Sequence, residues 1–149
     1  GEFTTIDAEK GWLEKYILLQ QEKLGEEIEL EFKIQDSYGK CKIHKMLLQP
    51  FVENAIKYNH TNGNVTVSAV RMKNTVVLTV ADTGNGIEES FREQIFEPFF
   101  RIDKSRSREL GGVGLGLALV REIVRVHDGT IEVHGNEQGG TTFEITMGL

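Results

Sequence analysis

The sequence predicts an α+β fold in which helices cover one face of a mixed sheet and form a two-layer sandwich with it. Strand-like segments cluster instead of alternating regularly with helices, which disfavours a doubly wound parallel sheet. Two of them, residues 65–71 and 75–81, flank a turn at Lys73 and Asn74 and therefore pair as an antiparallel hairpin. Three segments with apolar residues at helical spacing supply the second layer.

The first part of the chain contains a helix, a strand and a second helix. Residues 9–24 place apolar side chains at helical spacing and end before Gly25, a common helix stop. Residues 28–34 alternate apolar and charged side chains, which is typical of a strand with one buried face. Residues 44–59 are apolar and helical, and we expect Pro50 to kink that helix because it removes one backbone hydrogen bond.

The remainder adds a turn at 61–64, the hairpin, a long loop, a helix and a final hairpin. Residues 82–112 are loop-rich apart from a short helical stretch at 88–95. A long irregular segment in a compact domain is usually functional, so we expect a mobile lid there. The last elements are a helix at 115–127 and a hairpin that joins 131–134 to 141–147 through a turn at Gly139 and Gly140.

Length and composition indicate one globular domain. Of the 149 residues, 39% are hydrophobic and 27% charged, and no apolar run approaches the roughly 20 residues of a membrane-spanning helix. We expect residues 4–149 to form a single domain and residues 1–3 to be a remnant of cloning. The net charge of −6 disfavours nucleic acid as a partner, because that affinity depends on Lys and Arg neutralising phosphates. With Cys41 as the only cysteine, neither a disulfide nor a zinc cluster is expected.

Two glycine-rich segments are candidates for phosphate binding. Residues 82–87 (DTGNGI) follow a strand, and residues 111–117 (GGVGLGL) precede a helix. Glycine lets backbone amides approach phosphate oxygens, and a helix N-terminus adds the positive end of its dipole. The second segment lacks the ending of a P-loop and is followed by Leu119, where a dinucleotide fingerprint needs Gly or Ala. The first has Gly84 and Gly86 at positions where a calcium loop needs oxygen ligands. Taken singly, either segment fits a turn or a helix start equally well.

A third element gathers four polar side chains on one helix. Glu53, Asn54, Lys57 and Tyr58 lie within about one and a half turns, and positions 54, 57 and 58 share one face. A carboxylate, an amide, an ammonium and an aromatic hydroxyl therefore converge there.

In this order and spacing the segments resemble the Bergerat-type ATP-binding fold, which histidine kinases share with gyrase-type topoisomerases, heat-shock chaperones and mismatch-repair ATPases. Residues 53–58 (ENAIKY) resemble its N box, 82–86 (DTGNG) its G1 box and 112–117 (GVGLGL) its G2 box. Residues 95–101 (IFEPFFR) resemble the F box, which is characteristic of histidine kinases. The resemblance extends over nearly the whole chain, from about residue 13 to residue 143. It implies a mostly antiparallel sheet and an ATP lid.

The resemblance implies a role for each polar residue of the N-box helix. Asn54 would give its side-chain oxygen to Mg²⁺, and Glu53 would act as general base and orient the attacking imidazole. Lys57 would offset phosphate charge and Tyr58 would flank the base. The alternatives are ordinary surface positions for the first three and a core position for the tyrosine. Pro50 departs from the family pattern, because many histidine kinases carry an additional asparagine at this position, and the segment around it resembles the LytS-like branch.

The glycine segments and their flanks would hold the nucleotide. Asp82 would accept a hydrogen bond from the adenine amino group and so reject guanine, which offers a carbonyl there; an N-cap is the alternative. Arg101 would reach the terminal phosphate or the phosphohistidine, although most charges of the lid are solvated. Thr142 would close the adenine pocket. The other expected nucleotide-binding residues are Gly84, Gly86 and Ile87 in the first segment and Gly112, Gly114, Leu115, Gly116 and Leu117 in the second.

The resemblance thus implies the catalytic domain of a bacterial sensor histidine kinase, which transfers the γ-phosphoryl group of Mg-ATP to a histidine. None of the four histidines has the flanking pattern of a phosphoacceptor, so the acceptor is expected on dimerisation helices of the same protein outside this sequence. We also expect a downstream response regulator, a cytoplasmic location within a membrane-anchored sensor, and a monomeric isolated domain.

Two other functions of the same fold are alternatives. An anti-sigma-type serine kinase is disfavoured by the F box, and a non-catalytic nucleotide sensor is disfavoured by the presence of both Glu53 and Asn54. Gyrase-like or chaperone-like hydrolysis is weaker still, because those proteins attach further domains that complete their catalytic apparatus.

Overall fold

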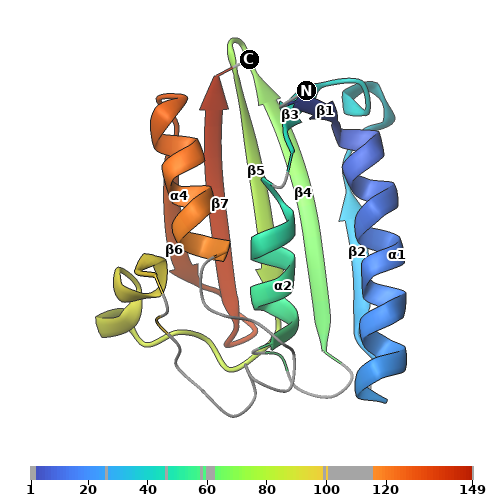
Figure 1. Ribbon diagram of the computed structural model, residues 1–149, viewed down its shortest axis with the longest axis vertical. Coiled ribbons are helices and arrows are strands. Elements are labelled where there is room, and N and C mark those ends of the chain that lie inside the picture. Colours follow the sequence, from blue (N-terminus) through green and yellow to red (C-terminus); the bar gives the residue numbers. More distant parts are fainter. Residues whose placement is uncertain are drawn as a thin grey trace.

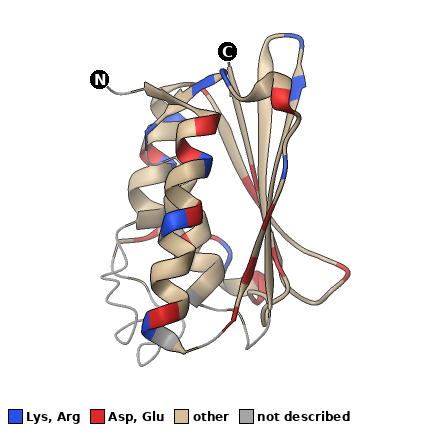
Figure 2. Ribbon diagram, turned by 90° about the vertical axis from the view of Figure 1, so that its right-hand side faces the viewer, with Lys and Arg blue, Asp and Glu red and all other residues tan. Residues whose placement is uncertain are grey.

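The computed structural model describes residues 3–25, 27–45, 47–57, 59, 63–98, 100 and 116–148. The elements form two layers, with the helices on one side and a five-stranded sheet on the other (Figure 1 and Figure 2). No helix in this part of the chain is both long and apolar enough to cross a membrane. The helices are α1 (Ile6–Leu24), α2 (Gln49–Lys57) and α4 (Gly116–Val126), with 3-10 helices η1 (Asp36–Tyr38), η2 (Glu89–Phe91) and η3 (Gln94–Phe96).

The main sheet has the strand order β2-β4-β5-β7-β6. β2 runs parallel to β4, and the other neighbouring pairs are antiparallel. This mixed, mostly antiparallel sheet with helices on one face confirms the predicted α+β sandwich. Its strands are β2 (Glu29–Lys33), β4 (Asn64–Met72), β5 (Thr75–Asp82), β6 (Thr130–Gly135) and β7 (Thr141–Gly148).

A second, two-stranded sheet has no counterpart in the sequence-based prediction. Strand β1 (Phe3–Thr5) pairs antiparallel with β3 (Lys42–His44). The Phe3 ring lies 5.8 Å from the ring of His44 and 5.9 Å from that of His127, so Phe3 contributes to the fold. Strands of three residues show too little alternation to be recognised. The cloning origin of residues 1–3 and the single-domain extent of 4–149 stay predictions.

Helix α1 begins at Ile6, three residues before its predicted start. Thr5 is the N-cap: its Oγ1 accepts a hydrogen bond from the Ala8 backbone N–H at 3.1 Å, which satisfies one of the free donors of the first turn. The helix ends at Gly25, which has a positive φ of 66° as a left-handed cap.

The prediction of a kinked helix over 44–59 is wrong. Residues 42–44 form strand β3, and α2 begins only at Gln49. Pro50 therefore lies in the first helical turn, where its missing N–H loses no partner and its fixed φ suits the helix. The short helix expected at 88–95 is instead the pair η2 and η3, and residues 101–112 of the expected lid lie outside the described residues.

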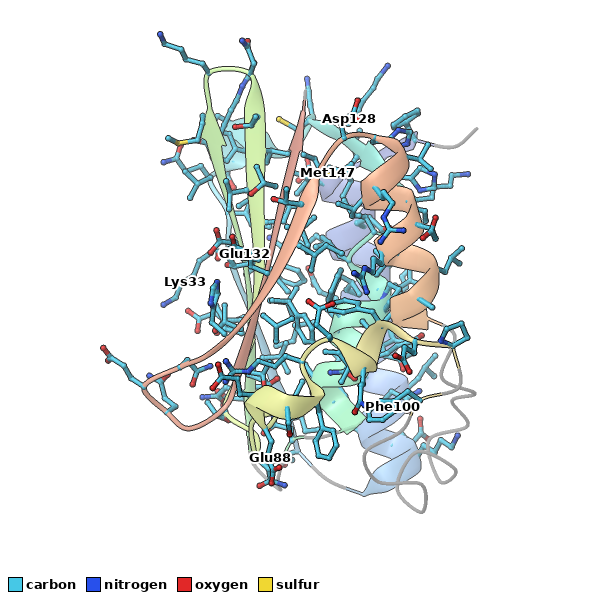
Figure 3. The ribbon with its side chains drawn as sticks, turned by 90° about the vertical axis from the view of Figure 1, so that its left-hand side faces the viewer. Lys33, Glu88, Phe100, Asp128, Glu132 and Met147 are labelled. Atoms are coloured by element: carbon cyan, nitrogen blue, oxygen red, sulfur yellow. The ribbon has the colours of Figure 1, made fainter. Side chains whose placement is uncertain are left out.

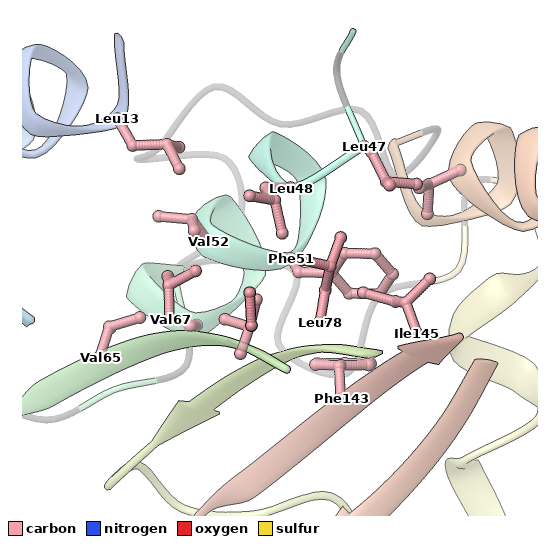
Figure 4. Packing of buried hydrophobic residues seen from close by; sticks show 14 of the residues in the cluster. Leu13, Leu47, Leu48, Phe51, Val52, Val65, Val67, Leu78, Phe143 and Ile145 are labelled. Carbon is pink, nitrogen blue, oxygen red and sulfur yellow. The ribbon is translucent and has the colours of Figure 1, made fainter. Parts of the chain in front are cut away.

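The core lies between the helical layer and the sheet. In Figure 4, the Phe51 side chain of α2 lies among Leu78, Phe143 and Ile145, and all four are 0% exposed. The rings of Phe51 and Phe143 are 4.9 Å apart. Full burial of such a side chain stabilises the fold by about 1.5–3 kcal/mol. This packing fixes α2 over the sheet and thereby places the polar residues that α2 carries.

Candidate functional site

Asp82, the last residue of β5, is held in place by backbone groups from two segments. Its side chain is buried, and Oδ1 accepts hydrogen bonds from the N–H of Gly84 at 2.9 Å and of Thr141 at 3.2 Å. The first bond closes the turn after the strand, and the second crosses to β7. The carboxylate is therefore fixed relative to both, as a group that reads one edge of a ligand must be.

The loop after Asp82 packs directly against the turn between β6 and β7. Gly86 has φ 74°, and a Cβ at this position would lie 2.8 Å from the carbonyl oxygen of Gly139. A Cβ on Gly140 would overlap the carbonyl oxygen of Asp82. Both positions therefore require glycine, and Gly84 and Ile87 are buried in the same region. Figure 3 shows the segment from Glu88 to Phe100 at the same end of the molecule as this turn.

A polar network ties the end of α2 to the end of β5. Asn59, two residues beyond α2, donates from Nδ2 to the carbonyl oxygen of Asn64 at 3.1 Å. The Asn64 N–H donates to Thr83 Oγ1 at 2.9 Å, and the Thr83 hydroxyl donates to Asn59 Oδ1 at 3.4 Å. Asn59, just beyond the N-box helix, and Thr83, the residue after Asp82, thus meet.

Residues one turn apart on helix α2 form two neighbouring rows. Pro50 and Asn54 are one turn apart, and the Pro50 ring faces the start of α4, where a Cβ added to Gly116 would lie 3.4 Å from Pro50 Cβ. Half-buried Asn54 therefore shares the row that faces α4. Gln49 and Glu53 form the neighbouring row, joined by a hydrogen bond from Gln49 Nε2 to Glu53 Oε1 at 2.9 Å.

Tyr16 of α1 is half-buried in the helical layer. Burial, and after it the negative charge of Glu53, raises the pKa of the Tyr16 hydroxyl well above its usual value. Tyr16 in turn stacks on Trp12, with ring centroids 5.3 Å apart. Glu53 itself accepts its hydrogen bond from Gln49, one turn earlier in the same helix.

The start of α4 is positioned by the core and by the F-box segment. Val120 and Val124 are buried, and the Arg121 guanidinium lies 5.3 Å from the centre of the Phe96 ring of η3. Gly116 and Leu117 form the first residues of the helix and are half-buried. The N-terminus of a helix offers free N–H groups and the positive end of a dipole, which suits a phosphate.

Thr142 lies on the opposite face of the sheet from Asp82. Successive residues of a strand point to opposite faces, and β7 alternates between buried Thr141 and Phe143 and half-buried Thr142. Thr142 Oγ1 accepts a hydrogen bond from Asn136 Nδ2 at 3.3 Å. The structure therefore brings Thr141, and not the Thr142 side chain, beside Asp82. Thr141 stands two residues before the core residue Phe143 and therefore lies on the same face of β7. This alternation is the sequence signal that could have identified Thr141 as the residue beside Asp82.

Several expected site residues lie outside the described residues. These are Tyr58, Arg101, Gly112, Gly114 and Leu115, together with the side chain of Lys57. Their roles stay predictions.

Comparison with known proteins decides the family. A family model described as "Histidine kinase-, DNA gyrase B-, and HSP90-like ATPase" matches residues 42–149, which include Asp82, α2 and α4. The chain belongs to this family. Its ATPase-type domain extends from β3 to the C-terminal strand, and the segment with α1 and β2 precedes the matched residues.

The relatives of this ATPase-family domain are sensor kinases. Sensor histidine kinase CpxA of Escherichia coli is 34% identical over 149 residues, which cover 97% of this chain and 32% of CpxA. Signal transduction histidine-protein kinase ArlS of Staphylococcus aureus is 40% identical over 109 residues, which cover 71% of this chain and 24% of ArlS. The chain therefore spans about a quarter to a third of the length of these relatives.

Solved structures agree in fold. The catalytic domain of histidine kinase ThkA superposes with a TM-score of 0.75 at 26% identity, covering 99% of this chain and 96% of that one. Full-length ShkA in complex with AMPPNP superposes with a TM-score of 0.74 at 26% identity, covering 97% of this chain and 30% of that one. ThkA in complex with the response regulator TrrA superposes with a TM-score of 0.69 at 25% identity, covering 98% of this chain and 41% of that one. The chain is thus an ATP-binding catalytic domain of the sensor histidine kinase type.

Proposed function

We propose that this domain transfers the γ-phosphoryl group of ATP to a histidine on the dimerisation helices of a longer, membrane-anchored sensor kinase, on its cytoplasmic side. One observation carries the proposal: hydrogen bonds among Asn59, Asn64 and Thr83 join the end of α2 to the end of β5, where the carboxylate of Asp82 is fixed, and Pro50 of the same helix packs against the start of α4. The sensor-kinase names of the relatives support it.

The adenine base would bind at Asp82. A buried carboxylate accepts a hydrogen bond from the 6-amino group, whereas a carbonyl at that position would face another acceptor and leave both unpaired. Gly84, Gly86 and Ile87 would line the base. Thr141, instead of Thr142, would close the adenine pocket.

The triphosphate would extend from the base toward α4. Gly116 and Leu117, with Gly112, Gly114 and Leu115 before them, would offer backbone N–H groups. Lys57 and Arg101 would offset the phosphate charge, and Tyr58 would flank the base.

Magnesium would be held by Asn54 together with the phosphates. A side-chain amide oxygen is a hard ligand of the kind that Mg²⁺ accepts, and one protein ligand is sufficient because the ion keeps several waters. Half-buried Asn54 on the row facing α4 fits this role. Bound there, the ion would neutralise charge on the transferred phosphoryl group.

Glu53 fits the alternative of an ordinary helix-surface position better than the role of a general base. Its carboxylate accepts a hydrogen bond from Gln49 Nε2, one turn earlier in the same helix, as an ordinary helix position allows. In the transfer, an imidazole nitrogen forms a bond to the γ-phosphorus while the bond to the oxygen of ADP breaks, and the imidazole proton leaves to solvent. Glu53→Gln should then keep most of the transfer rate; a drop of 100-fold or more would restore Glu53 as the base.

The remaining partners are a response regulator and the dimerisation helices. The complex of ThkA with the regulator TrrA supports a regulator that receives the phosphoryl group from the histidine.

The test combines this domain with the separately expressed dimerisation helices of the same protein and γ-labelled ATP. Acid-labile label on a histidine of the helices supports the proposal. Label on serine of a partner protein would favour the anti-sigma type of kinase, and nucleotide binding without transfer would favour a sensor.

A further inference from the structure

One asparagine outside the recognised motifs organises the surroundings of Asp82. Asn136 follows β6 and starts the turn to β7, and it is half-buried. Its side-chain oxygen Oδ1 accepts from the N–H of Gln138 at 3.1 Å and of Gly140 at 3.0 Å. Its Nδ2 donates to the carbonyl oxygen of Asp82 at 2.9 Å, across 54 positions of the sequence.

The same turn is also closed by its backbone. The Asn136 N–H donates to the Gly140 carbonyl oxygen at 3.2 Å, and the Gly139 N–H donates to the Asn136 carbonyl oxygen at 3.0 Å. Asn136 therefore fixes both the shape of the turn and its position against β5. Asn is suited to this because one amide supplies two donors and an acceptor.

The consequence falls on the carboxylate of Asp82. Asn136 holds Gly140 through Oδ1 and the Asp82 main chain through Nδ2, so the next residue, Thr141, reaches Asp82 Oδ1 with its N–H. Gly140 leaves no room for adjustment, because its Cα already packs on the Asp82 carbonyl. Losing the Nδ2 bond would remove one of the bonds that hold the turn before Thr141 against Asp82.

We infer that Asn136 is a positioning residue for nucleotide recognition: it clamps the β6–β7 turn onto β5 and so sets the orientation in which Asp82 distinguishes adenine from other bases. The inference rests on the proposed role of Asp82. In this role Asn136 acts through the turn and through Asp82.

The test measures affinities for ADP and for inosine diphosphate, whose base has a carbonyl in place of the 6-amino group. Asn136→Asp keeps the acceptor for the two turn N–H groups but replaces the donor to Asp82 by an oxygen. It should lower ADP affinity about tenfold, as expected for one buried hydrogen bond replaced by two facing acceptors. The weaker affinity for inosine diphosphate should change less than about threefold, so the preference for ADP shrinks.

Two further variants separate positioning from a general loss of structure. Asn136→Ala removes all side-chain bonds and should reduce both the preference and the thermal stability. Gln138→Ala, in the same turn, changes an exposed side chain and should leave both affinities unchanged. If Asn136→Asp retains the wild-type preference for ADP, or if both affinities fall by the same factor, the inference is overturned.

Failure of the underlying assignment gives a different pattern. If wild-type protein shows no preference for ADP over inosine diphosphate, or if Asp82→Asn keeps that preference, the role of Asp82 is wrong. If Asp82→Asn abolishes the preference while Asn136→Asp retains it, only the role of Asn136 is wrong.

Discussion

At the base end of the candidate nucleotide site, Asp82 receives hydrogen bonds from two backbone N–H groups of two different segments. At the proposed phosphate end, Asn54 lies one turn after Pro50, which packs against the start of α4. The base end is therefore preorganised by the sheet and its turns. The proposed phosphate end consists of a helix row and a helix terminus, and in our proposal a bound cation would complete it.

This difference implies that the two ends respond differently to substitution. Changes at the base end should weaken nucleotide binding with or without magnesium. Changes at the phosphate end should weaken only the part of the affinity that magnesium adds.

The largest effect is expected for Asp82→Asn. The substitution removes the charge that accepts the adenine amino group and should lower ADP affinity by about 10- to 100-fold, since hydrogen bonds to charged groups contribute about 1.5–3 kcal/mol. Titration with a fluorescent ADP analogue measures it. Asp128→Asn, on an exposed residue with φ 58° that asparagine tolerates, is the control and should bind normally. Unchanged affinity of Asp82→Asn would show that the base binds elsewhere.

Gly140→Ala should strain the base end through sterics alone. The added methyl group overlaps the Asp82 carbonyl oxygen, so the turn must shift, at a cost of about 1–3 kcal/mol in the free energy of unfolding. Urea denaturation measures this cost, and ADP affinity should fall in parallel. Gly148→Ala, where a Cβ meets no atom within 4 Å, should stay within about 0.5 kcal/mol of the wild type. Equal stability of the two variants would contradict the close packing of this turn.

Asn54→Ala should act only through magnesium. The affinity for ATP in the presence of Mg²⁺ should fall about tenfold, the usual size of one lost ligand contact, while the affinity in EDTA stays at the wild-type value. Calorimetry in both conditions measures the two values. Glu53→Gln, on the neighbouring row of α2, should keep the full effect of magnesium. A loss for Asn54→Ala that persists in EDTA would mean that Asn54 supports the fold and not the ion.

The smallest effect concerns the pH dependence of stability that the buried hydroxyl of Tyr16 in α1 causes. The folded state raises the pKa of Tyr16 above its unfolded value of 10.0, chiefly by burial and then by the charge of Glu53. The neutral hydroxyl therefore contributes stability that is fully present below about pH 10 and is lost as the pH rises toward the folded pKa. Unfolding of wild type and Tyr16→Phe should show a steeper loss above pH 10 for the wild type. Parallel curves would show that the Tyr16 hydroxyl is not coupled to folding.

Local signals made the fold and the base end predictable. The β4–β5 hairpin, the segment around Asp82 and the presence of helix α4 follow from alternation, turn residues and helical spacing. Strands β1 and β3 escaped prediction because three residues carry too little pattern. The predicted kink at Pro50 was wrong because proline breaks a helix only in its interior and is well suited to the first turn. Which case applies depends on where α2 begins.

Features that depend on register or on distant partners were not predictable. The choice between Thr141 and Thr142 depends on which face of β7 meets Asp82. Asn136 belongs to no motif because its bond to Asp82 joins residues far apart in the sequence.

Calorimetry of the wild-type chain with AMPPNP and Mg²⁺, beside the same titration of Asp82→Asn, tests the central claim most directly. The account predicts a saturable heat with one nucleotide per chain for the wild type, and a strong reduction for the variant. No heat with the wild type, or equal heats for both proteins, would contradict it.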